Sequence, residues 1–330
     1  MERALCTFFQ PAAILFFGDE NMTNLKRPAA FFVRLKKYMF VYLLLAPALI
    51  ATFIFNYLPL PGILIAFKDF DIFEGIFKSP WAPEFGLKYI KEIFQVPMIY
   101  ESILNTLNIS VLLLIVGFPA PILLALLLNE VRVAAFRRTI QTLSFLPHFL
   151  SWISVIAIAY SFYSLSGPLN DLMAAWYGED KRQMFLASQS FFVPNVIILS
   201  LWKELGWSCI IYLAAIAALD VQQYEAACID GASRLQQIVY ITLPGILPTA
   251  MILLILKLGG LFASNFELIY GLQNPFISFE VISTVVYKSG IQQANYPMAT
   301  ALGFINGLVA LFLTFVSNRI SKKVSGVSVW

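Results

Sequence analysis

The residues best suited to chemistry lie in one short polar segment between two long apolar runs. This segment reads Asp220-Val-Gln-Gln-Tyr-Glu-Ala-Ala-Cys-Ile-Asp-Gly-Ala-Ser-Arg234. Its pattern predicts a short helix over 225–230 that ends at Gly231, because glycine is the usual residue after a helix C-terminus. A second helical stretch begins at Ser233, and Pro244 suits the first turn of the next apolar helix. The segment is therefore predicted to be a helix–glycine–helix elbow.

Docking on another protein, rather than catalysis, is the chemistry that this elbow allows. Ala226 and Ala227 leave a helix face on which another backbone can approach closely, and Gly231 has no side chain at the apex. The carboxylates of Glu225 and Asp230 offer charges that Arg or Lys of a partner can meet. Such an elbow suits insertion into a groove on a second protein. The alternative is a plain amphipathic connector between two helices.

A second set of candidates consists of charged residues inside the apolar runs, which mark functional sites by default. Lys203 and Glu204 are adjacent, so they point about 100° apart on a helix and each needs its own partner. For Lys257, an internal ion pair or snorkelling is an equally open alternative. The sign of the charge that this set would attract is undecided, because Glu204 and Glu267 offset the two lysines.

Aromatic faces, amides and carboxylates are the groups that bind sugars, and the apolar runs contain several of them. Each of the aromatic residues has the alternative of facing lipid or the protein core. The candidate residues for a substrate path are Trp202, Lys203, Glu204, Trp207, Lys257, Asn265, Glu267, Tyr270 and Asn306.

Catalytic, cofactor-binding and metal-binding motifs are absent from the sequence. The one histidine, His148, excludes an HExxH motif and leaves one possible base for a catalytic triad. No GxxxxGK[ST] motif is present to bind nucleotide phosphates. Cys6, Cys209 and Cys228 are too far apart in sequence to indicate a zinc site or a disulfide framework. We therefore expect no enzyme activity and no cofactor in this chain, and energy for any uphill transport must come from another polypeptide.

The composition identifies an integral membrane protein. Of 330 residues, 59% are hydrophobic and 12% are charged, whereas about a quarter of the residues in a soluble domain are charged. The mean hydropathy is +0.78, and the net charge of +3 is too small to indicate a nucleic-acid partner. Long continuous apolar runs favour helices over a barrel. Six membrane-spanning helices are predicted, over residues 38–59, 105–128, 140–163, 194–219, 244–270 and 298–316.

The distribution of Lys and Arg predicts the orientation in the cell membrane. Thirteen of them fall in the N-terminal segment, the second and fourth connections and the tail, against seven in the alternate connections. Because cytoplasmic segments carry the excess of positive charge, both termini are expected to be cytoplasmic. The predicted organisation is a cytoplasmic N-terminal extension over 1–37, a transmembrane domain over 38–320 and a cytoplasmic tail over 321–330. A start at Met22 would remove most of the extension.

These motifs resemble those of a known family of transport proteins. Glu225-Ala226-Ala227, Asp230-Gly231-Ala232 and Ile241-Thr-Leu-Pro244 resemble the EAA loop (220–243) of binding-protein-dependent ABC importer permeases. The segments 146–152, 201–207 and 265–270 resemble the carbohydrate branch of that family. More narrowly, 273–275, 300–303 and 317–321 resemble permeases for oligosaccharides and polysaccharide fragments, including those of alginate importers. The resemblance covers about residues 38–323.

The resemblance implies an all-α integral membrane protein with the type I ABC importer permease fold. It further implies a heterodimer with a second permease, two ATP-binding subunits that hold Mg-ATP and grip the EAA loop, and an extracytoplasmic solute-binding protein. The outer loops 68–97 and 164–192 would supply the docking surface for that binding protein. Two alternatives remain open: a permease of the same fold for a non-sugar solute, and a standalone channel or secondary carrier.

Overall fold

The computed structural model describes residues 38–260 and 265–325. The chain forms two units, of which the first ends at Pro61 and the second begins at Gly62. The described part of the first unit contains α3 (Met39–Thr52), which includes Pro47, and a π-helical turn, η1 (Phe53–Tyr57). A 3₁₀ segment, η2 (Leu60–Phe67), follows. The predicted extension over 1–37 lies outside the described residues.

Six helices are long and apolar enough to cross a membrane, and the described residues contain no strand. An isolated bridge between Lys68 and Trp81 is the nearest approach to a sheet there. The prediction of an all-helical membrane protein with six spans is confirmed. The six candidate spans are Met39–Phe67, Pro97–Glu130, Trp152–Tyr177, Gln189–Ala217, Arg234–Gly259 and Tyr296–Lys323.

The second span is divided by prolines. It consists of α6 (Pro97–Gly117) and α7 (Pro119–Glu130), and it begins at Pro97 rather than at residue 105. Proline suits the first turn of each helix because the first amides of a helix have no internal partner. Pro121, inside α7, has no N–H to donate to the carbonyl of Gly117 four residues earlier. This leaves the Gly117 carbonyl free to accept a bond from elsewhere.

The prediction of a continuous third span over 140–163 was wrong. The chain forms α8 (Ala134–Phe145), a 3₁₀ turn η3 (Leu146–Phe149) and then α9 (Trp152–Tyr163) and α10 (Pro168–Tyr177). The break lies at Leu150 and Ser151, which are extended, with ψ of 141° and 154°. Ser151 then starts α9 as its N-cap, because its hydroxyl oxygen accepts a hydrogen bond from the amide of Ser154 at 3.2 Å.

The fifth span, predicted over 244–270, lies about ten residues earlier in the chain, over Arg234–Gly259. The helix begins earlier, with α13 (Arg234–Gln237), runs through a π-helical turn η5 (Ile238–Thr242) and ends with α14 (Leu243–Gly259). Pro244 therefore lies within a continuous helix and does not start it, and the π turn directly precedes this proline. A separate helix, α15 (Phe266–Leu272), begins after Asn265, which caps it by accepting from the Leu268 amide.

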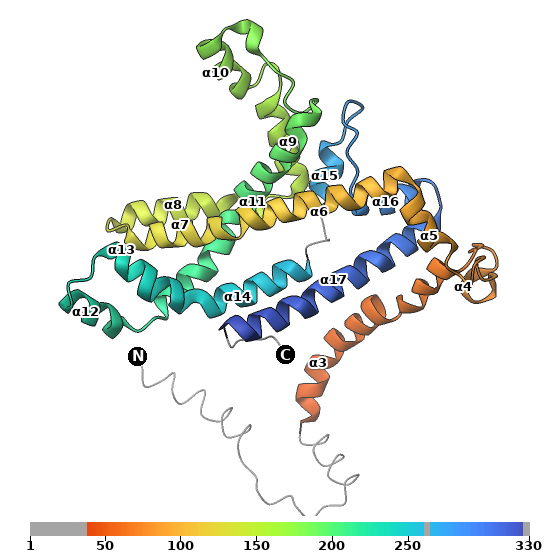
Figure 1. Ribbon diagram of the computed structural model, residues 1–330, viewed down its shortest axis with the longest axis horizontal. Helices are drawn as coiled ribbons and strands as arrows, with labels where there is room; N and C mark the ends of the chain where they lie inside the picture. The colour runs from red at the N-terminus through yellow and green to blue at the C-terminus, as the bar shows by residue number, and fades with distance from the viewer. Residues whose placement is uncertain (1–37, 261–264, 326–330) are drawn as a thin grey trace, which may run out of the picture. The chain divides into compact units, whose positions relative to one another are not determined.

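The second unit is built around α11 (Gln189–Ala217), which forms the whole fourth span (Figure 1). It packs on α7, α8 and α14. Gly206 permits the close approach to α8, because a Cβ at this position would lie only 2.1 Å from the Ser144 carbonyl oxygen. Two apolar clusters lie along α11, one around Val155, Val196 and Leu268 and the other around Leu126, Tyr212 and Ile246.

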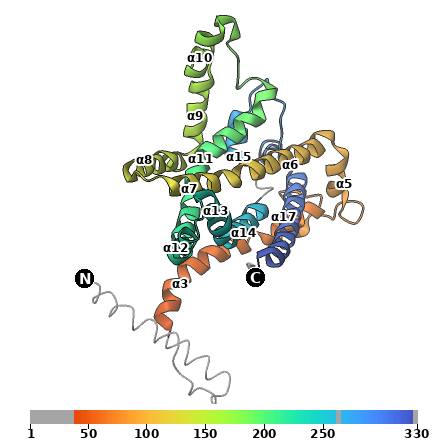
Figure 2. The same ribbon diagram turned by 60° about the vertical axis from the view of Figure 1, so that its left-hand side comes forward.

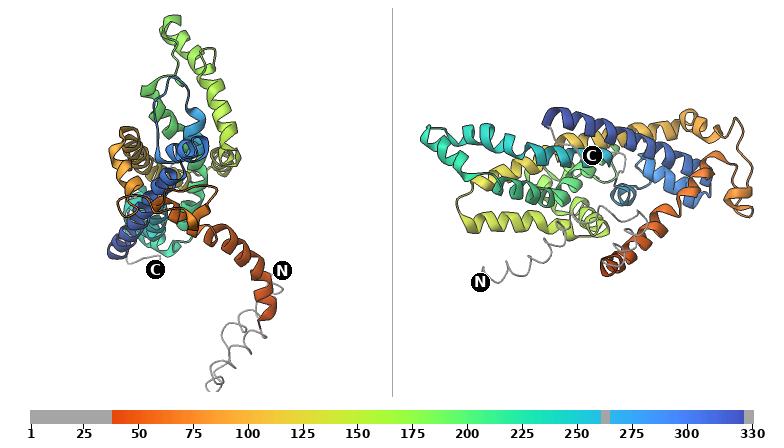
Figure 3. Two further views of the ribbon diagram at one scale, coloured as in Figure 1. Left: turned by 90° about the vertical axis from the view of Figure 1, so that its right-hand side faces the viewer. Right: turned by 90° about the horizontal axis from the view of Figure 1, so that it is seen from below.

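The last helix, α17 (Tyr296–Ser325), packs along α14 in all views (Figure 3). It continues past residue 320, so the predicted tail does not begin at a structural boundary. A third apolar cluster joins α17 to α5 (Lys88–Gln95), α6 and α16 (Ile282–Tyr287), the last of which leads into the π turn η6 (Lys288–Gln292). Within this unit, α12 (Val221–Ile229) lies at the end opposite α5 (Figures 1 and 3). Figures 1 and 2 show α10 well away from both.

Candidate functional site

The elbow predicted at 220–243 is a short helix, a left-handed glycine and a capped second helix. Asp220 starts α12 by accepting a hydrogen bond from the Gln222 amide at 2.9 Å. After α12, Gly231 has φ +77°, a conformation that glycine adopts at no steric cost. The amides of Gly231 and Ala232 bond back to the carbonyls of Cys228 and Ala227, which is the Schellman pattern of a helix end.

The second half of the elbow is fixed to the first by side-chain hydrogen bonds. Ser233 and Gln236 form a capping box at the start of α13. The amide of Gln237, a buried residue, donates to the sulfur of Cys228 and to the carbonyl of Ala232, both at 3.2 Å. These bonds link the two helices across the glycine, so the elbow is a rigid unit.

One further bond connects α12 to the membrane-spanning part. The hydroxyls of Tyr224 and Thr242 lie 2.9 Å apart, and Thr242 is buried in the π turn that leads into α14. This hydrogen bond ties α12 to the helix that continues as α14.

The predicted docking residues of the elbow lie on its exposed side. Glu225, Ala226, Asp230 and Gly231 are exposed. Ala227 and Ala232 are half-buried, and Pro244 is exposed where the helix continues. Apolar side chains stand beside them: Val221 is 65% exposed, Ile229 86% and Leu235 70%. An apolar surface of this kind, rimmed by charges, is typical of a protein–protein contact.

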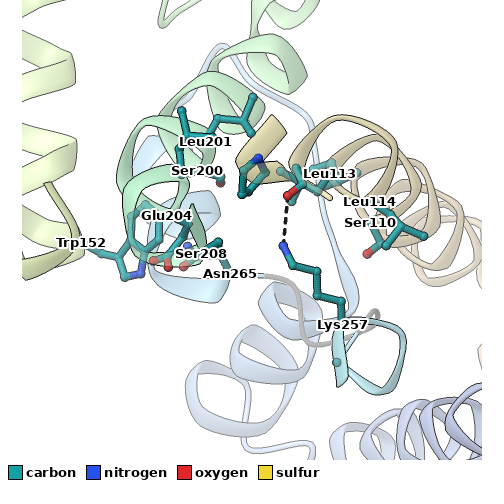
Figure 4. A pocket seen from close by; sticks show the side chains of 15 residues that line it. Ser110, Leu113, Leu114, Trp152, Ser200, Leu201, Glu204, Ser208, Lys257 and Asn265 are labelled. Carbon is teal, nitrogen blue, oxygen red and sulfur yellow. Dashed lines mark hydrogen bonds between the residues drawn. The ribbon is translucent and has the colours of Figure 1, made fainter. Parts of the chain in front are cut away.

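A cavity of about 420 Å³ lies between α6, α11 and α14 (Figure 4), within the range of ligand pockets. Three of the predicted path residues line it: Glu204 from α11, Lys257 from α14 and Asn265 from the start of α15. Lys257 points toward α6, where its Nζ donates to the Gly117 carbonyl at 3.2 Å. The cavity is mostly apolar apart from these groups and four serine and tryptophan side chains: Ser110, Trp152, Ser200 and Ser208.

Those four residues were missed by the sequence reasoning. Ser200, Glu204 and Ser208 are spaced four residues apart on α11, so they share one helix face. That spacing was a signal that could have found the two serines. Trp152 offered no such signal, because its place beside the cavity results from the break before α9.

Lys203, also predicted for the path, does not line this cavity. Lys203 is buried, and its ammonium donates to the carbonyls of His148 at 2.6 Å and Leu150 at 2.7 Å. It also lies over the Trp152 ring, 5.2 Å from the centroid. These carbonyls belong to the break between η3 and α9, where helical partners are missing, so Lys203 is a structural residue.

The tryptophans predicted for the path do not line the cavity either. Trp207 stacks on His148, with ring centroids 4.4 Å apart, and on Phe145. The ring of His148 also faces the cavity residue Glu204, with Nδ1 3.2 Å from Oε2. Trp202 is 42% exposed and lies outside the cavity lining.

Glu267, Tyr270 and Asn306 lie outside the cavity lining as well. Glu267 is exposed on the first turn of α15. The Tyr270 hydroxyl accepts a hydrogen bond from Gln292 at 3.1 Å, and its ring packs on Phe266. Asn306, on α17, has a buried side-chain oxygen without a hydrogen-bond partner among the described residues. These residues lie on other helices than Lys257. Glu267 and Tyr270 belong to α15, which is separate from α14, and Asn306 belongs to α17.

The two loops predicted as docking surface are well ordered and carry exposed aromatic residues. In the first, the buried ammonium of Lys68 donates to the Phe77 carbonyl at 2.9 Å. Phe73 and Phe85 are almost entirely exposed and Phe77 is 77% exposed, and Phe85 has a left-handed φ of 59°. Such strain in a non-glycine residue is typical of functional surfaces. Nearby, burial and the Asp69 carboxylate raise the pKa of Tyr89.

In the second loop, Asn170 is fully buried and bonds to the backbone of Ser164 and Gln183. The Arg182 guanidinium donates to Glu179 at 2.6 Å and holds the pKa of that carboxyl below its usual value. Trp176 is 77% exposed beside these residues. Both loops are therefore preformed surfaces with projecting aromatic side chains.

No group of three or more potential metal ligands occurs in the described part of the chain.

Residues 117–325 match the family described as "Binding-protein-dependent transport system inner membrane component". The chain is similar to Protein LplB of Bacillus subtilis, with 42% identity over 88% of this chain and 90% of the relative. It is also similar to the polygalacturonan/rhamnogalacturonan transport system permease protein YteP of the same organism, with 41% identity over 88% and 90% of the two chains.

Solved structures resemble the chain over nearly its whole length. A chain of a bacterial ABC transporter involved in the import of the acidic polysaccharide alginate matches with a TM-score of 0.81 and 38% identity. A bacterial alginate ABC transporter in complex with an alginate pentasaccharide-bound periplasmic protein matches with a TM-score of 0.82 and 37% identity. Each match covers 90% of this chain and 99% of the other.

Proposed function

The chain belongs to the family of binding-protein-dependent transport system inner membrane components, and we therefore propose that it forms, with a second permease, the membrane path of a saccharide importer. It is a permease of the ABC importer type with six spans, and its relatives are permeases for sugars and polysaccharides. The cargo that we propose is an oligosaccharide or a fragment of a polysaccharide, with alginate and pectin-like fragments as the first candidates, following the names of its relatives.

The elbow is the observation that carries the proposed mechanism. ATP-binding subunits grip Glu225 to Ala232, and closure of two such subunits around Mg-ATP displaces α12. The Tyr224–Thr242 contact and the bonds of Gln237 pass this displacement to α14, which carries Lys257 of the cavity. The energy is thus supplied by partner subunits and reaches the cavity through this chain's own helices.

The proposed orientation places the elbow and both termini in the cytoplasm. The excess of Lys and Arg in the connections on the elbow side supports it. The two loops with Phe73, Phe85 and Trp176 then face outward, where a solute-binding protein docks on their exposed aromatic side chains. Aromatic residues are enriched at the centre of such interfaces.

A second permease is expected because α9 leaves much apolar surface uncovered by its own chain. Ile153 is 78% exposed and Phe162 is 44% exposed on this helix. Either lipid or another membrane helix must cover these side chains. A heterodimer would cover part of this surface and close the open side of the cavity.

Reconstitution of the complete importer tests the proposal. We expect ATP-dependent uptake of labelled oligosaccharides into liposomes that contain both permeases and both ATPases, when the binding protein is added outside. Liposomes that contain this chain alone should take up nothing. Uptake by the chain alone would instead indicate a channel or carrier. A binding protein that retains an amino acid, a peptide or phosphate, and no saccharide, would contradict the proposed cargo.

A further inference from the structure

Lys257 is an ammonium group in a membrane cavity with spare capacity for hydrogen bonds. It has three N–H donors, and in the described part of the chain its one hydrogen bond is to the Gly117 carbonyl. That carbonyl is available because Pro121, four residues later, has no amide hydrogen. None of the ion pairs among the described residues includes Lys257.

The opposite wall of the cavity, on α11, carries further polar groups that a sugar can contact. Ser200 is 9% exposed, and its Oγ has no hydrogen-bond partner among the described residues. Buried hydroxyls nearly always have a partner, so this group indicates a ligand or water in the cavity. Glu204 and Ser208 follow on the same face of α11, and sugar hydroxyls donate well to a carboxylate such as Glu204.

The cavity lining holds fewer charged residues than the sequence indicates. Lys203 and Glu267 both lie outside it, so Lys257 is the one cation of the lining. Glu204, the one acidic residue in the lining, has a carboxylate oxygen 3.2 Å from His148 Nδ1. An ammonium in a largely apolar cavity is stabilised by a carboxylate that approaches it, and a carboxylate of the cargo can use the N–H donors that Lys257 does not give to Gly117.

We propose that Lys257 is the residue of this chain that binds a carboxylate of the cargo, and that it makes the path selective for uronate-containing saccharides over neutral ones. The carboxylate of one sugar unit bonds to the Lys257 ammonium. The hydroxyls of that unit bond to Glu204 and Ser200 on the facing helix, and Trp152 offers an apolar ring face beside them. This inference rests on the proposed function, because it concerns the cargo of the same path.

A charge series at Lys257 in the complete importer tests the inference. The probes are a galacturonate tetrasaccharide and its methyl-esterified, uncharged counterpart, each delivered by the same binding protein into liposomes. Uptake of the acidic probe should fall about tenfold in Lys257→Gln, as expected for the loss of one charge-assisted bond. It should fall further in Lys257→Glu, and Lys257→Arg should keep most of it. Uptake of the esterified probe should change little across the series.

Several results would overturn the inference without touching the proposed function. Equal loss in Lys257→Arg, Lys257→Gln and Lys257→Glu would mean that Lys257 only supports the Gly117 carbonyl. Unchanged uptake of the acidic probe in all three variants would remove Lys257 from the path. A wild-type importer that prefers the esterified probe would refute the selectivity. A wild-type importer that takes up no saccharide would instead refute the proposed function itself. ATP hydrolysis stimulated by the binding protein verifies assembly of each variant.

Discussion

The two lysines inside the spans show how the same residue type serves two purposes in one membrane protein. Lys203 is saturated, since two carbonyls and an aromatic ring surround its ammonium. Lys257 has one carbonyl partner among the described residues and faces a cavity. A charge in the membrane must be compensated, and the break at 146–151 supplies that compensation for Lys203. For Lys257, one carbonyl of the described residues supplies part of that compensation.

The two hydrogen bonds of Lys203 lead to a prediction about stability. Lys203→Met leaves the carbonyls of His148 and Leu150 buried without a donor, and each unsatisfied group costs about 1–3 kcal/mol. We expect a melting temperature several degrees lower for the detergent-solubilised complex, measured by thermal unfolding. Lys322→Met, which changes an exposed lysine near the end of α17, should leave it unchanged. Equal melting temperatures for the two variants would contradict the role assigned to Lys203.

At the scale of elements, the elbow is a lever made of two short helices joined at Gly231. A Cβ at Gly231 would meet no atom within 4 Å, and Gly303, in the middle of α17, is equally open. The two glycines differ because Gly231 has a left-handed φ and lies at the proposed contact with the ATPase. This difference gives a matched pair of substitutions.

Gly231→Val should leave insertion in the membrane intact but abolish the stimulation of ATP hydrolysis by the loaded binding protein. The left-handed conformation costs a residue with a Cβ about 1–2 kcal/mol, and the added side chain occupies the space needed by the partner. Gly303→Val should keep both insertion and stimulation. The assay is ATP hydrolysis by the purified complex with and without the binding protein. Normal stimulation in Gly231→Val would count against the lever.

The spans and the elbow were predictable from the sequence because each has a local signal. Apolar length marks the spans, and Gly231 and Ser233 mark the end of one helix and the start of the next. The cap at Asp220 was missed, so the first helix was predicted to begin at residue 225, whereas it begins at Val221. The helix breaks at 146–151 and after Gly259 were missed, because both lie in apolar sequence where hydropathy does not change. Which residues line the cavity depends on the rotation of each helix about its axis and on these breaks. Glu204, Lys257 and Asn265 were predicted because they are polar residues in apolar sequence, whereas Trp152 was not predicted.

At the scale of the whole molecule, transport requires that the elbow and the aromatic loops lie on opposite sides of the membrane. The chain provides reporters for both. Cys228 is exposed on α12, and Cys209 is buried. Phe85 is fully exposed on the first aromatic loop. With Cys6 replaced by Ser, a membrane-impermeant maleimide can therefore report the side and the accessibility of each surface.

We expect Cys228 of the chain in cells to resist the maleimide from outside and to react in inside-out membrane vesicles. Phe85→Cys should show the reverse. Co-expression of the ATP-binding subunits should then protect Cys228 in the vesicles, because the exposed face of α12 becomes buried in their groove, and it should leave Phe85→Cys unaffected. Labelling of Cys228 from outside would invert the proposed orientation. Undiminished labelling beside the ATPases would mean that the elbow is free in solvent, and a free elbow could not deliver their energy to α14 and its Lys257.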